Sequence, residues 1–191
     1  MIENSPLLLY IKAISFGVAS ALLFLLSRAS IRRPRSHGFF RFFAFETILI
    51  LVLFNINVWI LNPLSWHQIV SWMLLSVSLY LILSSVLILK ATGKQDPNRD
   101  DAPLLEFEKT TRLVTSGVYR FIRHPMYSSL LSLTWGIFFK APGWIGFILA
   151  LLATSFLITT ARAEEIENLR FFGEGYRAYM QKTRMFIPYI F

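Results

Sequence analysis

The chain alternates between long apolar runs and shorter polar connections. Three apolar runs occupy the N-terminal half, at residues 7–26, 42–61 and 64–89. Each is close to or above the ~20 residues that a helix needs to cross ~30 Å of hydrocarbon. Lys12 lies near the outer end of the first run, where its long side chain can reach the lipid head groups. The pattern therefore predicts three membrane-spanning helices within residues 1–89.

The C-terminal half begins with the longest polar stretch, residues 90–123, which is followed by a helical hairpin. The first arm of the hairpin, residues 126–139, is apolar but short for a membrane span. An Ala-Pro-Gly sequence at 141–143 turns the chain, and residues 144–161 return. We interpret the short arm as a helix that ends above a bound molecule. The whole pattern predicts one all-α integral membrane domain, residues 1–191, with five transmembrane helices.

Composition agrees with a membrane protein and excludes several other classes. Hydrophobic residues make up 55% of the 191 positions, charged residues make up 16%, and the mean hydropathy is +0.55. A soluble domain carries about 25% charged residues, so this chain has too little polar surface for a water-exposed globule. The chain has no cysteine, which excludes disulfide scaffolds, thiolate metal sites and cysteine nucleophiles. The sequence also has no metal-ligand spacing, phosphate-binding glycine loop or serine-nucleophile elbow.

The net charge of +8 follows the membrane boundaries and does not form a nucleic-acid-binding face. All 19 Lys and Arg residues except Lys12 and Lys140 lie between the first two spans, after the third span or after the fifth. Cytoplasmic loops are the ones that carry an excess of Lys and Arg. We therefore expect the N-terminus outside, and the C-terminus and the polar segments that could do chemistry in the cytoplasm.

Two polar clusters could carry chemistry, and the first is Arg123-His124-Pro125. Proline favours the first turn of a helix, which places Arg123 and His124 at the N-terminus of the fourth span. The unpaired N–H groups and the positive end of a helix dipole favour a carboxylate or phosphate at this position. The alternative is that Arg123 contacts lipid head groups and His124 only caps the helix.

The second cluster consists of Glu164, Glu165 and Glu167, which follow Arg162 at the end of the fifth span. Acidic side chains near a helix C-terminus oppose the helix dipole. Their presence therefore indicates a role, such as holding ribose hydroxyls or a cationic group. The alternative is a solvated helix end at which Arg162 pairs with Glu165 or Glu167. The sequence suggests no partner for His37, which lies in the basic loop after the first span.

The two clusters belong to a longer motif. It reads Leu-Val-Thr-Ser-Gly-Val-Tyr at 113–119, Arg-His-Pro-x-Tyr at 123–127, the hydrophobic hairpin, Glu-Glu at 164–165, Phe-Gly-x-x-Tyr-x-x-Tyr at 172–179 and a late Pro188. In this order the motif resembles the isoprenylcysteine carboxyl methyltransferase family of membrane enzymes, which is related to phospholipid N-methyltransferases. The resemblance covers residues 105–191. The first three spans resemble the family only in being membrane-spanning segments.

The resemblance implies a methyl transfer that depends on S-adenosylmethionine, with S-adenosylhomocysteine as the product and the cofactor enclosed at the cytoplasmic face. The implied cofactor contacts are Leu113, Val114, Tyr119, His124, Pro125, Met126, Tyr127 and Glu164. Arg123 joins them on chemical grounds, because its guanidinium group could neutralise the cofactor's carboxylate. The implied substrate contact is Arg162, and Glu165 could assist an amine nucleophile. Residues 171–191 would cover the cofactor as a lid.

The substrate that the resemblance implies is lipophilic, most directly the carboxylate of a prenylated cysteine, free or in a peptide. Three alternatives remain: a phospholipid N-methyltransferase, a reductase and a non-enzymatic membrane scaffold. Membrane sterol reductases have a similar hairpin and a similar Arg-His-Pro-x-Tyr element, but they bind NADPH. The acidic pair Glu164-Glu165 disfavours the 2′-phosphate of that cofactor.

Overall fold

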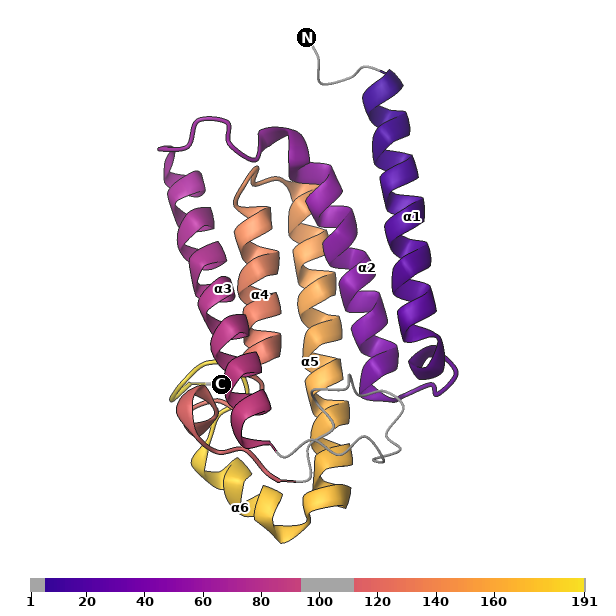
Figure 1. Cartoon of the computed structure of the whole chain (residues 1–191). Helices are drawn as coiled ribbons and strands as arrows, with labels where there is room; N and C mark the ends of the chain where they lie inside the picture. The colour runs from indigo at the N-terminus through magenta and orange to yellow at the C-terminus, as the bar shows by residue number, and fades with distance from the viewer. Residues whose placement is uncertain (1–5, 94–111, 191) are drawn as a thin grey trace.

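The computed structural model describes residues 6–93 and 112–190, whose regular elements are helices (Figure 1). The first half contains α1 (Pro6–Ile31), α2 (His37–Asn55), the 3-10 turn η1 (Ile56–Val58) and α3 (Trp66–Thr92). The second half contains the 3-10 turn η3 (Gly117–Arg120), α4 (Pro125–Phe138), α5 (Trp144–Phe172) and α6 (Glu174–Lys182). The predicted all-α fold is confirmed for these residues. The start of the predicted methyltransferase core, residues 105–111, lies outside them.

Within the described residues, four helices are long and apolar enough to cross a membrane, namely α1, α2 with η1, α3 and α5. They correspond to four of the five predicted spans, and they identify the chain as an integral membrane protein. The other predicted span corresponds to α4, which has 14 residues. At 1.5 Å per residue it is about 21 Å long, which is shorter than the ~30 Å hydrocarbon layer.

The short helix α4 lies at the centre of the bundle, where it packs against α2, α3 and α5 (Figure 1). Helix α1 packs along α2 at the edge of the bundle. The core contains Leu51, Ile137 and Leu157, which are fully buried together with Ala150 and Ala153 of α5. Small side chains let two membrane helices approach closely, which agrees with the extensive contact between α2 and α5.

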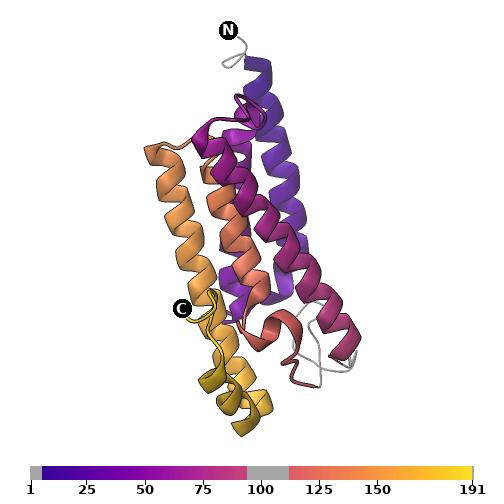
Figure 2. The same ribbon diagram turned by 90° about the vertical axis from the view of Figure 1, so that its left-hand side faces the viewer.

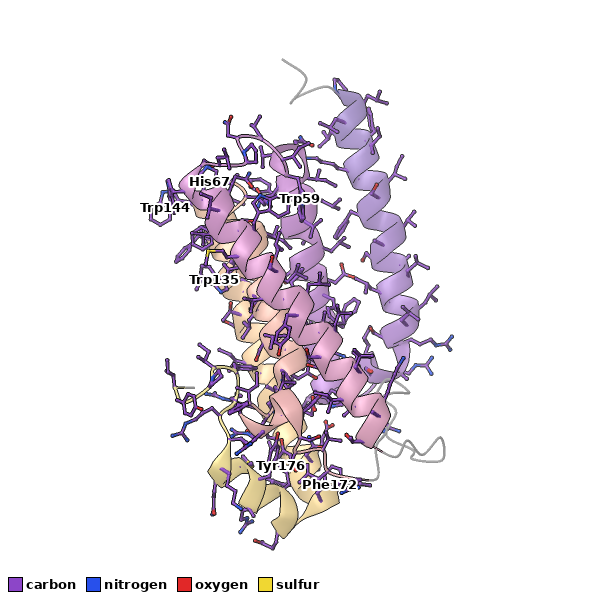
Figure 3. The ribbon with its side chains drawn as sticks, turned by 60° about the vertical axis from the view of Figure 1, so that its left-hand side comes forward. Trp59, His67, Trp135, Trp144, Phe172 and Tyr176 are labelled. Atoms are coloured by element: carbon purple, nitrogen blue, oxygen red, sulfur yellow. The ribbon has the colours of Figure 1, made fainter. Side chains whose placement is uncertain are left out.

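Side chains from neighbouring elements hold the C-terminal end of α4. The last carbonyl groups of a helix have no partner within the helix, and lipid offers none. Four side-chain donors bond such carbonyls here, namely Asn55 to Ile137 (3.0 Å), His67 to Phe139 (3.0 Å), Gln68 to Lys140 (3.3 Å) and Ser71 to Gly136 (2.7 Å). Figure 3 shows His67 at this end of the bundle among Trp59, Trp135 and Trp144, with Tyr176 at the opposite end. The carbonyl groups at this end of α4 are thus hydrogen-bonded by side chains of the bundle.

The N-terminal end of α4 leaves a space beneath it, because α3 and α5 continue past Pro125. Figure 2 shows α3 diverging from α5 toward this end, with the segment that precedes α4 between them. Gly117 lets this segment pass close to α3, since its φ is +58° and a Cβ there would overlap the Ile88 side chain. Helix α6 folds back at Gly173, whose φ is also +58°. We call this end of the bundle the pocket end.

Candidate functional site

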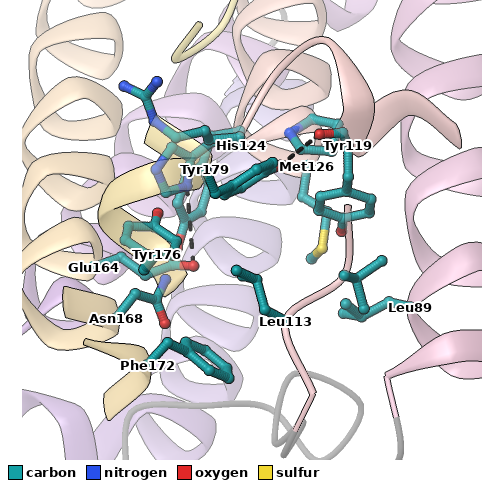
Figure 4. Close-up of a pocket in the computed structure, with 14 residues that line it drawn as sticks. Leu89, Leu113, Tyr119, His124, Met126, Glu164, Asn168, Phe172, Tyr176 and Tyr179 are labelled. Carbon is teal, nitrogen blue, oxygen red and sulfur yellow. Dashed lines mark hydrogen bonds and ion pairs between the residues drawn. The ribbon is translucent and has the colours of Figure 1, made fainter. Parts of the chain in front are cut away.

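A cavity lies at the pocket end, enclosed by the end of α3, the segment 113–127, the end of α5 and α6. Its empty volume is ≈ 700 Å³, a value that includes the space at the open mouth. Figure 4 shows the side chains around it. The lining residues are Leu89, Leu113, Val114, Tyr119, Arg123, His124, Pro125, Met126, Tyr127, Glu164, Asn168, Phe172, Tyr176 and Tyr179.

The cavity has an apolar wall and a polar wall. The end of α3 and the segment before α4 supply the apolar wall with Leu89, Leu113, Val114 and Met126. The polar wall comes from α5, α6 and the residue that precedes α4, with Glu164, Asn168, Tyr176, Tyr179 and His124. Such a lining suits a ligand that has both an apolar surface and several hydrogen-bonding or charged groups.

The C-terminal segment pairs with the residues that lead into α4. The backbone N–H groups of Arg123 and His124 donate to Arg184 O (2.7 Å) and Met185 O (3.1 Å). In the other direction, the N–H of Arg184 donates to Phe121 O (3.1 Å). The hydroxyl of Ser128, in the first turn of α4, donates to Phe186 O (2.9 Å). Residues 184–186 are therefore fixed against the segment that carries the lining residues Arg123 and His124.

Glu164 is the carboxylate of the cavity wall. The hydroxyl of Tyr127 donates to Glu164 Oε2 at 2.5 Å, and His124 Nδ1 lies 3.9 Å from Glu164 Oε1. His37 and Arg41 of α2 also act electrostatically on this carboxylate. The Glu164 side chain keeps 24% of its surface exposed, so it can bind a ligand while the protein holds it in place.

Glu165 points away from the cavity and orients Arg123. Its Oε1 accepts a hydrogen bond from Arg123 Nε at 2.6 Å, and His124 Nε2 lies 3.5 Å from the same oxygen. A terminal nitrogen of the guanidinium donates to Met180 O (3.2 Å) and Thr183 O (2.5 Å). Cations stabilise the C-terminal carbonyl groups of a helix. Arg123 therefore fastens the end of α6 to α5 beside the cavity.

Glu167 pairs with the first residue of α2. Glu167 Oε1 accepts the backbone N–H of His37 at 3.1 Å, and Glu167 Oε2 lies 2.5 Å from His37 Nδ1. The carboxylate thus occupies the N-terminus of α2, where the helix dipole favours an anion. The sequence suggested no partner for His37, because the two residues are 130 positions apart.

Two tyrosines on α6 stay neutral donors in the site. Burial raises the pKa of Tyr176 strongly, and the Glu164 and Glu165 carboxylates raise it further. Burial also raises the pKa of Tyr179. The hydroxyl of Tyr179 donates to Tyr119 O at 2.5 Å, which ties α6 to η3 across the cavity.

The structure brings the nine residues expected to contact a cofactor around this one cavity. They are Leu113, Val114, Tyr119, Arg123, His124, Pro125, Met126, Tyr127 and Glu164. The two residues expected to act on the substrate are not among the lining residues. Arg162 is exposed on α5, and Glu165 is buried behind Arg123. The roles of all eleven residues remain predictions.

Five lining residues were not among the expected cofactor contacts. Asn168 and Phe172 follow Glu164 at four-residue intervals on α5, so helical periodicity could have found them. Tyr176 and Tyr179 were noticed only as parts of the motif. Leu89 lies at the end of α3, and no local pattern in the sequence marks it as part of the site.

Comparison with known proteins identifies relatives of the chain. The family model described as phospholipid methyltransferase matches residues 66–174. A methanethiol S-methyltransferase from Pseudomonas sp. (strain GM41(2012)) is 32% identical over 71 residues, which cover 37% of this chain and 26% of the relative. The protein-S-isoprenylcysteine O-methyltransferase of Mus musculus is 28% identical over 133 residues, which cover 68% of this chain and 47% of the relative. No solved structure matches the chain.

These matches agree with the resemblance expected from the motif. The family match covers more than half of the chain and contains α3, α4 and α5, whose ends surround the cavity. The chain spans about half the length or less of the relatives it matches. The chain belongs to the phospholipid methyltransferase family.

Proposed function

We propose that the protein transfers a methyl group from S-adenosylmethionine to a lipophilic nucleophile in the cavity at the pocket end. The observation that carries the proposal is the placement of the residues. Nine residues expected from the motif, drawn from the segment before α4, the first turn of α4 and the end of α5, line one cavity. The methyltransferase relatives support the same chemistry.

The lining residues fit S-adenosylmethionine as a ligand. The Glu164 carboxylate can accept hydrogen bonds from ribose hydroxyls or from an ammonium group. His124 lines the cavity beside this carboxylate, with Nδ1 3.9 Å from Glu164 Oε1, while its Nε2 faces Glu165 Oε1 at 3.5 Å. The apolar wall around Leu113, Val114 and Met126 suits the flat adenine ring or a lipid chain.

The residues of the chain would bind and orient the reactants and exclude water. When bound, S-adenosylmethionine supplies a methyl group on a positively charged sulfur. Glu164, held by Tyr127 and flanked by His124, places negative charge in the cavity. The pairing of residues 184–186 with the start of α4 holds the lining residues Arg123 and His124 in place. Charges attract more strongly where water is excluded, so a charged nucleophile is drawn toward the cationic sulfur in such a site.

The acceptor that we propose first is the carboxylate of a prenylated cysteine. The mouse relative is named for that reaction, while the Pseudomonas relative is named for methanethiol. A carboxylate attacks without losing a proton, whereas a thiol or an amine must first lose one. For a thiol or an amine, Glu164, which lines the cavity, would be the base that removes this proton. Methyl transfer to S-farnesylcysteine, and none to its methyl ester, to a thiol or to phosphatidylethanolamine, is the expected result.

Calorimetric titration of the detergent-purified protein tests the cofactor. We expect saturable binding of S-adenosylmethionine and S-adenosylhomocysteine and no binding of NADPH. Glu164→Gln should weaken both interactions by about tenfold or more, since a hydrogen bond to a charged group contributes ~1.5–3 kcal/mol. The matched control is Glu174→Gln, because the Glu174 side chain is 83% exposed on α6. Binding of NADPH alone would indicate a reductase, and no binding at all would leave the scaffold interpretation.

We also propose the topology expected from the distribution of Lys and Arg, with α4 and α5 forming a hairpin and the pocket end in the cytoplasm. Because the chain has no cysteine, single introduced cysteines report their side cleanly. Arg35→Cys lies in the loop between α1 and α2, and Leu64→Cys lies in the loop between η1 and α3. A membrane-impermeant thiol reagent applied to intact cells should label only Leu64→Cys. Labelling of Arg35→Cys alone would reverse the topology.

A further inference from the structure

The end of α5 that carries the acidic residues extends past the N-terminal end of α4. Figure 1 shows α5 continuing past the end of α4 toward α6. Glu164 lies on this extended part and lines the cavity. Besides the hydrogen bond from Tyr127 of α4, its position depends on the elements that hold the last turns of α5. One of these contacts is the Arg123–Glu165 pair.

On the opposite side, the first turn of α2 holds the end of α5. His37 is fully buried, and Glu167 accepts hydrogen bonds from its backbone N–H and lies 2.5 Å from its ring Nδ1. Two groups of one residue thus contact one carboxylate, which fixes both the distance and the rotation of α5 relative to α2. Hydrogen bonds to a carboxylate are about twice as strong as those between neutral groups.

The same turn of α2 also acts on Glu164. Glu164 and Glu167 are three residues apart, so they lie on one face of α5. His37 and Arg41 are four residues apart and share one face of α2, and both act electrostatically on the Glu164 carboxylate. Arg41 is buried as well. The N-terminal part of α2 and the acidic turn of α5 therefore form one charged contact that is buried on the α2 side and ends at the cavity.

We infer that His37 and Glu167 are positioning residues for the cofactor site, and that they act by holding Glu164 against the cavity. This inference rests on the function proposed above. Neither residue lines the cavity, so neither is assigned a contact with the ligand. The pair connects the α1–α2 half of the bundle, which lies outside the expected motif, to the carboxylate that the motif supplies.

The test compares S-adenosylmethionine affinity in four variants of the full-length protein in detergent. His37→Ala and Glu167→Ala remove the contact, and each should weaken binding about tenfold. His37→Asn retains a side-chain N–H near the position of Nδ1 without an ionisable ring, and it should bind within about twofold of the wild type. His67→Asn is the matched control at the opposite end of the bundle, where His67 bonds Phe139 O, and its affinity should be unchanged.

The thermal unfolding midpoint of each variant separates positioning from folding. We expect His37→Asn to restore affinity at whatever midpoint it shows, which a purely structural role would not predict. If His37→Ala does not fold, Glu167→Ala carries the same expectation. Wild-type affinity in both alanine variants would overturn the inference. Equal loss in His37→Asn and His37→Ala would overturn it too, since the ring itself would then be required. Failure of the wild type to bind would instead refute the proposed function.

Discussion

At the scale of single residues, three carboxylates within four positions at the end of α5 have three different partners. Glu164 accepts a hydrogen bond from Tyr127 of α4, Glu165 pairs with Arg123 before α4, and Glu167 pairs with His37 of α2. Helix α5 continues past all three to Phe172, so they lie outside its last turn. Their partners fasten α5 to three other parts of the molecule.

Tyr127→Phe should weaken cofactor binding without unfolding the protein. The variant keeps the buried ring and removes only the hydroxyl that donates to Glu164 at 2.5 Å. A hydrogen bond to a charged group contributes ~1.5–3 kcal/mol, so we expect about a tenfold increase in the dissociation constant of S-adenosylmethionine. Tyr189→Phe is the control, because Tyr189 is 81% exposed. Equal affinities in the two variants, measured by calorimetry, would exclude a role for the hydroxyl in holding Glu164.

At the scale of helices, α4 is stabilised at both ends by groups outside it. Its carbonyl end meets donors on α2 and α3. Next to it, Lys140 is buried, donates to Gln68 Oε1 at 3.0 Å and lies 3.3 Å from the ring centroid of Trp72. A cation over an indole ring is attracted by it. A short central helix is possible here because neighbouring side chains supply the hydrogen-bond donors that water at a membrane surface would otherwise supply.

Lys140 makes the stability of this end dependent on pH. Burial lowers the pKa of Lys140 in the folded protein, whereas in the unfolded chain it is about 10.4. The folded state therefore binds this proton more weakly, and stability rises with pH from the lowered pKa up to about 10.4. The gain is about 1.4 kcal/mol for each unit by which the pKa is lowered.

Thermal unfolding of the wild type and of Lys140→Met between pH 8 and about pH 10 measures this effect. The free energy of unfolding of the wild type should rise with pH relative to that of the variant. The raised pKa values of Tyr176 and Tyr179 act in the opposite direction, but they contribute equally to both proteins. Parallel pH curves would show that the Trp72 ring compensates for the burial of the charge.

At the scale of the whole molecule, the site is assembled from segments that are distant in the sequence. The C-terminal residues 184–186 return to the start of α4, while α6 closes the opening between α3 and α5. The membrane helices provide a rigid frame, and the polar segments before α4 and after α5 complete the cavity. The expected lid, residues 171–191, contains Phe172, Tyr176 and Tyr179 of the cavity wall.

Truncation after Lys182 should abolish cofactor binding and leave the helical bundle in place. It removes the acceptors at Arg184, Met185 and Phe186 that bond residues 123, 124 and 128. Far-UV circular dichroism should retain most of the helical signal, since α1 to α6 end at or before Lys182. The matched control ends at Ile187 and keeps all of these bonds, so it should bind normally. Binding by the shorter protein would show that residues 183–186 are not needed to form the site.

Local patterns in the sequence predicted the membrane class, the four long helices and the short α4, whereas the resemblance supplied most of the nine residues around the cavity, whose roles remain predictions. They succeeded because run length, proline position and motif order are properties of neighbouring residues. Helical periodicity could also have extended the site from Glu164 to Asn168 and Phe172. Arg162 and Glu165 were expected to act on the substrate because they lie close to Glu164 in the sequence. Neither lines the cavity, since residues close together in a helix point in different directions.

The sequence by itself determined which segments are helices, because hydrophobicity and turn chemistry act over short distances. Only the tertiary structure decided how the three carboxylates are shared among their partners, and that His37 reaches Glu167 130 positions away. Those choices depend on which helix faces pack together and how far each helix is rotated. Rotation about a helix axis is set by packing with other helices, so no local pattern contains it.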